Sequence, residues 1–262
     1  MNSVKTGREG GVATVALARP ETRNALTDDD MLEELLDALH DAETDPEIGA
    51  LIVSAEGPAF STGGNVKDMA AKEGMFEGGP AELCEKYRET IQQLTRFMAT
   101  TDLVTIAAVN GPAVGAGFDL ALGCDLRIGT SRARFAHTFI EMGIVAGDGG
   151  VWLLARAVGW QRATELALTA RSMGAEEALE AGVLLELVPD SQLSIRAMEL
   201  AQSIASKPRP AVVMAKRMLR QARMMDLDQF LELSAAFQAV AHSTPEHADA
   251  VAQYLERLQS RD

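Results

Sequence analysis

Two aspartates lie in small-residue segments where a carboxylate could accept and donate protons. Asp148 belongs to the Gly-Asp-Gly-Gly turn at 147–150, ahead of a predicted helix, and Asp119 follows Ala116 by three residues on another predicted helix. Residues three apart share a helix face, so Asp119 and Ala116 are predicted to face the same way. A carboxylate in an apolar pocket has a raised pKa, which suits it to general acid–base catalysis. An aspartate ahead of a helix also fits an N-cap, and Asp148 could fill both roles.

His137 is a further candidate for proton transfer. If its segment is extended, it points the same way as Phe139, two residues later, and could relay protons to Asp148. A structural histidine is the alternative. The sequence has no His, Cys and Asp cluster with metal-ligand spacing, so no metal is predicted. It also lacks a P-loop, a GxGxxG turn after a strand and a nucleophilic serine elbow.

The elements that must position these residues follow from the apolar pattern. Short apolar runs between turn residues predict strands, and apolar residues at helical spacing predict helices. The predicted strands cover 12–18, 48–54, 103–109, 125–129 and 183–188, and the predicted helices include 83–98, 151–158 and 162–169. Strands alternate with helices to about residue 190, and helices alone follow. The sequence therefore predicts an α/β core over 1–200 and a C-terminal helical region over 201–262.

Length and charge exclude several classes of protein. The chain has 262 residues, 47% of them hydrophobic, and a formal net charge of −14. The length allows a substantial core, and the negative charge argues against nucleic-acid binding, which needs a basic face. No stretch is apolar enough for a membrane span or a signal peptide. Cys84 and Cys124 lack metal or CxxC spacing, so the chain is predicted to be soluble and cytoplasmic.

Four stretches, in order across nearly the whole chain, resemble the enoyl-CoA hydratase/isomerase (crotonase) superfamily. They are the Asn-Ala-Leu triplet at 24–26, the Ala-Phe-Ser-Thr-Gly-Gly-Asn-Val-Lys segment at 59–67, and the segments at 107–125 and 143–159. The resemblance implies ββα units wound into a spiral, with the C-terminal helices at the interface of a homotrimer or a dimer of trimers. It also implies an acyl-CoA thioester as substrate, without a further cofactor.

The resemblance implies an oxyanion hole made by the backbone N–H groups of Gly64 and Ala116. Such preorganised donors lower the barrier to a thioester enolate by about 3–4 kcal/mol each, and free N–H groups at a helix start also favour an anion. For CoA, the resemblance implies contacts from Arg23, Ala25, Asn65, Val66 and Lys67. The run 201–225 has no acidic residue and adds Lys216 as a candidate phosphate contact, with a solvated helix face as the alternative.

The chain departs from the superfamily pattern at the acid–base positions. Enoyl-CoA hydratases of the best-known type use two glutamates, whose positions fall on Asp119 and Phe139. Phe139 cannot transfer a proton, so Asp148 becomes the predicted catalytic carboxylate, with Asp119 as a second carboxylate or an orienting group. Phe139, Met142 and Val145 are predicted to line the acyl pocket.

The predicted function is that of an acyl-CoA lyase or isomerase, which hydrates or isomerises a 2-enoyl-CoA thioester. One alternative is hydrolysis of a carbon–carbon bond in a β-dicarbonyl compound, because a hydrolase type of the superfamily has the same Gly-Asp-Gly turn. That alternative predicts turnover without CoA. A non-catalytic acyl-CoA-binding protein is another alternative, and it predicts ligand binding without turnover.

Overall fold

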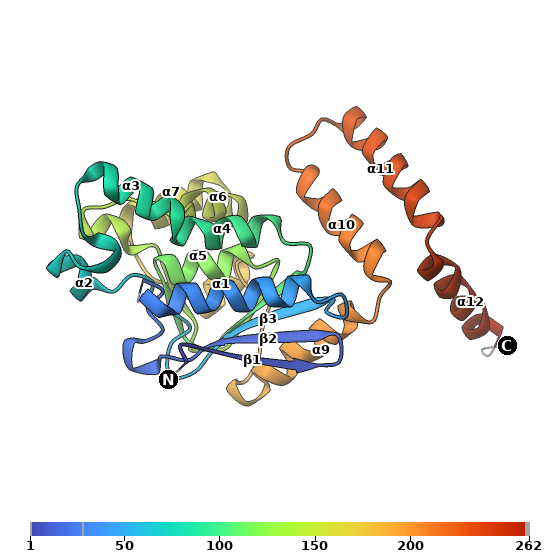
Figure 1. The fold of residues 1–262 in the computed structure, drawn as a ribbon, viewed down its shortest axis with the longest axis horizontal. Coiled ribbons are helices and arrows are strands. Elements are labelled where there is room, and N and C mark those ends of the chain that lie inside the picture. The colour runs from blue at the N-terminus through green and yellow to red at the C-terminus, as the bar shows by residue number, and fades with distance from the viewer. Residues whose placement is uncertain (1, 28, 260–262) are drawn as a thin grey trace.

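The computed structural model describes residues 2–27 and 29–259, and its larger sheet has the strand order β1-β2-β3-β4-β6-β9 (Figure 1). Its strands are β1 (Val4–Glu9), β2 (Val12–Leu17), β3 (Ala50–Ala55), β4 (Val104–Val109), β6 (Leu126–Gly129) and β9 (Glu186–Leu187). β1 and β2 form an antiparallel hairpin, and each later neighbour pairs in parallel. β1 was not predicted, because five of its six residues are exposed and give no apolar pattern. The strand predicted over 183–188 is reduced to the two residues of β9.

A smaller sheet joins β5 (Pro112–Val114), β7 (Arg134–Ala136) and β8 (Met173–Gly174). β5 continues through Gly115 into helix α5 (Ala116–Gly123), and β7 continues into the 3-10 helix η3 (Thr138–Met142). The parallel pairing of β5 with β7 places Val114 opposite Ala136, and the Gly115 N–H donates to the Ala136 carbonyl over 2.9 Å. This sheet therefore holds the start of α5 beside the segment that carries His137.

Helices cover both faces of the larger sheet. Leu51 and Val53 of β3 join the core beneath α1 (Asp29–Thr44), α4 (Ile91–Thr100) and α5. Ala50 and Ile52 face the other way and pack against α9 (Leu193–Ala205) (Figure 1). A parallel strand buried on both faces has a continuous apolar sequence, which is why the central strands were predicted.

The long helix predicted over 83–98 is two helices, α3 (Pro80–Glu89) and α4. They break at Thr90, whose φ of −117° and ψ of −101° are not helical. The hydroxyl and the N–H of Thr90 both donate to the Lys86 carbonyl, and such back-bonding from a side chain bends helices. The remaining helices of the core are α2 (Val66–Ala71), α6 (Gly150–Val158), α7 (Trp160–Thr169) and α8 (Ala175–Glu180), with 3-10 turns η1 (Pro20–Thr22), η2 (Gly74–Phe76) and η4 (Asp190–Gln192).

Beyond α9 the chain extends away from the core as α10 (Arg209–Gln221), α11 (Leu227–His242) and α12 (Pro245–Gln259) (Figure 1). The break between α9 and α10 falls at the prolines, as the sequence predicted. Residue 200, the predicted domain boundary, lies inside α9, which packs on the sheet; the division itself stays a prediction. In the described part of the chain, no helix combines the length and apolarity that a membrane crossing needs.

The basic residues of α10 anchor this helix to the core. The Lys216 ammonium is buried and contacts the Asp125 carboxylate at 2.6 Å and the Leu103 carbonyl. Arg217 pairs with Asp102, with Nε and Oδ1 2.9 Å apart, and Arg220 donates to the carbonyls that end α4. The prediction that Lys216 binds a CoA phosphate is therefore corrected, because its charge is already neutralised inside the fold.

We predict that Lys216→Met lowers the free energy of unfolding by about 1–3 kcal/mol. Methionine retains the apolar stem but leaves the Leu103 carbonyl and the Asp125 carboxylate without their shared donor. Denaturant unfolding measures this loss, and Lys207→Met, at an exposed position next to α10, serves as the control. Equal stability of the two variants would contradict an anchoring role.

Candidate active site

The two segments that carry Gly64 and Ala116 lie in direct contact. Ser61 and Ala113 form a parallel bridge, and the Val114 N–H donates to the Ser61 carbonyl over 2.9 Å. Gly63 has a φ of +75°, and a Cβ there would lie 2.8 Å from the Ala116 nitrogen. Only glycine permits this backbone and this approach. Two segments about 50 residues apart in sequence therefore meet at one point, as the predicted oxyanion hole requires.

Both predicted donors have free N–H groups. Across residues 2–27 and 29–259, neither the Gly64 N–H nor the Ala116 N–H donates a hydrogen bond within the protein. Ala116 is the first residue of α5, where the helix dipole is positive and the N–H has no partner in the helix. The site therefore presents backbone donors suited to a developing oxyanion.

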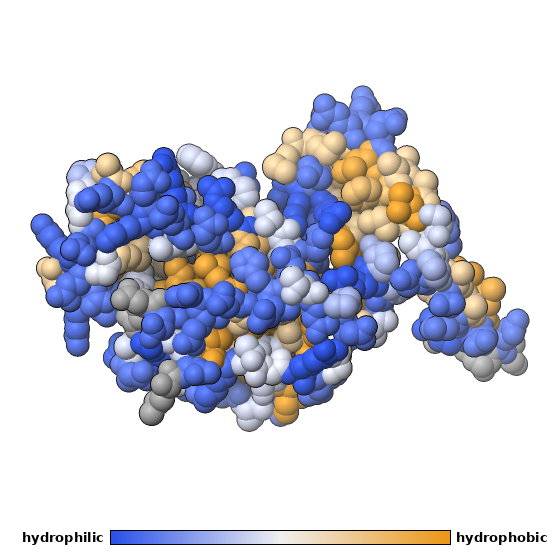
Figure 2. Space-filling view, in the orientation of Figure 1, coloured by the Kyte–Doolittle hydropathy of each residue, from blue (hydrophilic) through white to orange (hydrophobic). Residues whose placement is uncertain are grey.

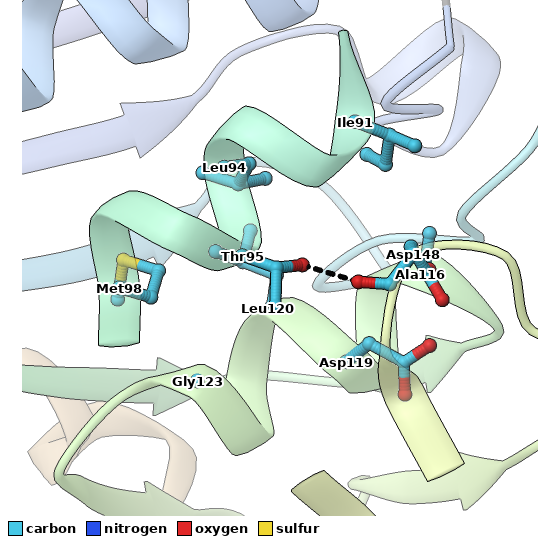
Figure 3. A pocket seen from close by; sticks show the side chains of 9 residues that line it. All are labelled: Ile91, Leu94, Thr95, Met98, Ala116, Asp119, Leu120, Gly123 and Asp148. Carbon is cyan, nitrogen blue, oxygen red and sulfur yellow. Dashed lines mark hydrogen bonds between the residues drawn. The ribbon is translucent and has the colours of Figure 1, made fainter. Parts of the chain in front are cut away.

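A small cavity beside Ala116 brings Asp119 and Asp148 together (Figure 3). The two carboxylates are 3% and 4% exposed, and the cavity has room for about one water molecule. Apolar side chains of α4 and α5 form most of its wall. The residues that line it are Ile91, Leu94, Thr95, Met98, Ala116, Asp119, Leu120, Gly123 and Asp148.

Asp119 is buried without a hydrogen bond to either carboxylate oxygen in the described part of the protein. Burial raises its pKa well above the usual range, and the negative charge of Asp148 adds to this effect. The imidazole of His137 lies beside Asp119, with Nε2 3.6 Å from Oδ1. A Cβ on Gly150 would lie 2.1–2.3 Å from the Asp119 carboxyl atoms, so the turn at 147–150 needs glycine there. Burial and the nearby charge of Asp148 therefore both favour the protonated form of Asp119.

Asp148 lies one residue before Gly149, which is the N-cap of α6, so the N-cap predicted for Asp148 is displaced by one residue, and its catalytic role stays a prediction. Its Oδ1 accepts the N–H of Gly150, the first residue of α6, over 3.2 Å, so it makes a contact of the capping type. Its carboxylate also borders the cavity, beside Asp119 (Figure 3). Its carbonyl accepts the Thr95 hydroxyl over 2.7 Å, which attaches the turn to α4.

His137 is 2% exposed, and its nearest carboxylate is that of Asp119. Burial lowers the pKa of its imidazole, while the charge of Asp148 acts in the opposite direction. The ring lies 4.8 Å from that of Phe139, centroid to centroid. Sequence reasoning considered His137 as a partner of Asp148, and the structure places it against Asp119 instead.

The three residues predicted to line the acyl pocket lie in different surroundings, and their role stays a prediction. Met142 and Val145 are 38% and 75% exposed and do not line the cavity that holds the carboxylates. Phe139 lies closer, with a ring carbon 3.7 Å from a Cβ built on Gly115. The apolar wall of the water-sized cavity comes mainly from α4. Its residues showed only helical periodicity in the sequence, which predicts burial but not which cavity a side chain faces.

The remaining CoA-binding candidates surround the oxyanion segments. Ala25 bridges to Gly63, and Arg23 is exposed with a left-handed φ of 55°. Asn65 caps α2 through a bond from the Lys67 N–H, and Val66 and Lys67 are exposed at the start of that helix. Their contact with CoA stays a prediction. Among the residues that the structure describes, no cluster of three or more His, Cys, Asp or Glu could hold a metal ion.

Comparison with known proteins points to one family. The model of the family described as Enoyl-CoA hydratase/isomerase matches residues 7–261. A short-chain-enoyl-CoA hydratase of Clostridium acetobutylicum is 32% identical over 258 residues, covering 98% of this chain and 96% of the relative. A 1,2-epoxyphenylacetyl-CoA isomerase of Escherichia coli K12 is 33% identical over 248 residues, covering 94% and 93%. The crystal structure of an enoyl-CoA hydratase from Bacillus anthracis has a TM-score of 0.90 at 27% identity, covering 97% and 96%.

The fold is thus a crotonase-like α/β core with a C-terminal helical region. The chain belongs to the enoyl-CoA hydratase/isomerase family. This confirms the resemblance inferred from the four sequence stretches. The relatives bear the names of different reactions, so the particular reaction must be argued from the site.

We predict that Asp119→Asn gains stability relative to the wild type as pH rises. The folded-state pKa of Asp119 lies above the unfolded value, so its favourable contribution is complete below about pH 4 and is lost as pH passes the folded pKa. Asparagine does not ionise and avoids this loss. Denaturant unfolding across this pH window measures the difference. If Asp119→Asn instead lost stability relative to the wild type as pH rises, the prediction would be wrong. The ionised form of Asp119 would then be stabilised in the folded protein, for example by a charged His137.

Proposed function

We propose that the protein hydrates or isomerises a 2-enoyl-CoA thioester through an enolate held by the N–H groups of Gly64 and Ala116. The observation that carries this proposal is the convergence of two buried carboxylates and the Ala116 backbone on one cavity. Asp148 is the acid–base residue in this proposal, and Asp119 is the second carboxylate. Membership of the family and the relatives named hydratase and isomerase support both reactions.

Hydration uses both carboxylates. Asp148 takes a proton from water while the water oxygen bonds to Cβ of the enoyl group, and the thioester oxygen becomes the enolate. Asp119, whose protonated form is favoured by burial beside Asp148, supplies the proton that bonds to Cα, and the proton on Asp148 then passes to Asp119 and restores both groups. The oxyanion donors stabilise the charge that develops between these two steps.

Isomerisation requires only one base. Asp148 removes a proton from Cγ of the 2-enoyl group, the dienolate charge rests on the thioester oxygen, and the same proton returns at Cα. Phe139 stands at the position of the second family glutamate and cannot transfer protons. This substitution favours isomerisation as the second candidate reaction.

We also propose that the protein is cytoplasmic and assembles as a trimer or a dimer of trimers through the C-terminal helices. These helices carry exposed apolar side chains, which form orange areas on the projecting arm in Figure 2. Contiguous apolar surface of this kind is typical of an interface between subunits. The exposed residues include Leu219, Leu227, Leu231 and Val240.

The first test mixes crotonyl-CoA with the wild type and, separately, with Asp148→Asn. Turnover is measured as the decrease in the absorbance of the conjugated enoyl group. We expect the variant to lose about 10²–10⁴-fold in kcat, because the acid–base group is removed while its shape is kept. Asp37→Asn, at an exposed position on α1, is the control and should match the wild type.

The other outcomes are decisive as well. Equal turnover by the wild type and Asp148→Asn would assign the chemistry to Asp119 and leave Asp148 as a helix cap. Absence of hydration, with formation of a conjugated product from a 3-enoyl-CoA, would establish the isomerase. Turnover of a β-diketone without CoA would favour the carbon–carbon hydrolase, and binding of acyl-CoA without any turnover would favour the non-catalytic alternative.

A further inference from the structure

Two side chains of helix α4 donate hydrogen bonds to the turn that carries Asp148, although helix and turn lie far apart in the sequence. The Gln92 amide nitrogen donates to the Gly147 carbonyl over 2.7 Å. The Thr95 hydroxyl donates to the Asp148 carbonyl over 2.7 Å, and Figure 3 shows this second bond. These partners are 55 and 53 residues apart. Gln92 and Thr95 are three residues apart, so they share one face of the helix. Two consecutive carbonyls of the turn are thus fixed to one rigid element.

The turn is otherwise attached through α6, since the Gly149 carbonyl accepts the N–H groups of Trp152 and Leu153. Three of its four residues are glycines, whose backbones are permissive. The Asp148 carboxylate accepts a hydrogen bond from the Gly150 N–H, a member of the same turn. The location of the carboxylate therefore depends on where the backbone of the turn lies.

Packing from the same side completes the attachment. A Cβ on Gly147 would lie 2.8 Å from the Tyr87 ring, so this ring rests against the turn. The Thr95 methyl group lies 3.3 Å from a Cβ built on Gly149. Thr95 therefore contributes both a hydroxyl and a methyl group to the turn, whereas valine would keep only the packing.

We propose that Thr95 and Gln92 are positioning residues that set the Asp148 carboxylate against the substrate and against Asp119. This inference rests on the proposed role of Asp148 in proton transfer. Neither side chain performs chemistry. Each acts through a main-chain carbonyl, so its loss displaces a reacting group without removing it. Displacements of about 1 Å reduce rates by about 10²-fold when geometry is critical.

The test compares Thr95→Val with Thr95→Ser and with Thr100→Val. Thr100 lies on the same helix, is exposed, and bonds only to its own helix through its hydroxyl. We expect Thr95→Val to lower kcat for crotonyl-CoA by about 10- to 100-fold with KM nearly unchanged. Thr95→Ser should restore most of the rate, and Thr100→Val should match the wild type. Gln92→Ala and the exposed Gln93→Ala form a second matched pair.

A second readout does not depend on turnover. The charge of Asp148 contributes to the raised pKa of Asp119, so displacement of Asp148 lowers that pKa. Carbon-13 NMR of labelled aspartate carboxyls follows this titration, and Asp119→Asn identifies the signal. We expect a lower Asp119 midpoint in Thr95→Val and Gln92→Ala than in the wild type, Thr100→Val or Gln93→Ala.

The two readouts separate the possible failures. Reduced stability in Thr95→Val, with an unchanged kcat and an unchanged Asp119 midpoint, would overturn the positioning role. If Asp148→Asn leaves turnover intact, the proposed catalytic role of Asp148 fails, and the Asp119 titration alone then decides whether α4 positions the turn.

Discussion

The burial of Asp119 beside Asp148 is the constraint on which the rest of the site depends. A carboxylate without hydrogen-bond donors is strongly disfavoured as an anion in an apolar cavity, and a second negative charge nearby increases the penalty. Holding a proton on Asp119 relieves both effects. The pair can then act asymmetrically, with one group that donates and one that accepts. The proposed hydration adds a proton to one carbon of the substrate and removes a proton from water, so it needs one carboxyl group that donates and one that accepts.

Close backbone approaches create that arrangement. Gly63 allows one oxyanion segment to contact the start of α5, and Gly150 leaves the space that the Asp119 carboxylate occupies. A Cβ at Gly63 would lie 2.8 Å from the Ala116 nitrogen, and a Cβ at Gly150 would lie 2.1–2.3 Å from the Asp119 carboxyl atoms, so a side chain at either position would force these groups apart. The small residues in the sequence motifs therefore serve tertiary contacts as well as local turns. This explains why the motifs at 59–67, 107–125 and 143–159 are rich in glycine and alanine.

Sequence reasoning located the groups that lie within short motifs, because a motif reports its own local geometry. The central strands, the start of α5 and the turn of Asp148 were all predictable in this way. Partners that meet only through the tertiary fold were not. Lys216 pairs with Asp125 across 91 residues, and His137 faces Asp119 rather than Asp148. Charge and periodicity identified these residues as candidates for a functional role. These patterns do not show which residue each side chain contacts in the folded protein.

Helix α4 links the C-terminal region to the catalytic turn. At the C-terminal end of α4, the Thr100 carbonyl accepts a hydrogen bond from Arg220 of α10. In the N-terminal half of α4, Gln92 and Thr95 donate to two carbonyls of the Asp148 turn. Ten helical residues span about 15 Å and bend little, so the position of either attachment constrains the other. In the basic run of α10, which the sequence suggested for phosphate binding, Arg220 donates to the carbonyls at the C-terminal end of α4. Helix α10 and the Asp148 turn thus attach to the same ten-residue helix, although no side chain of α10 lines the cavity.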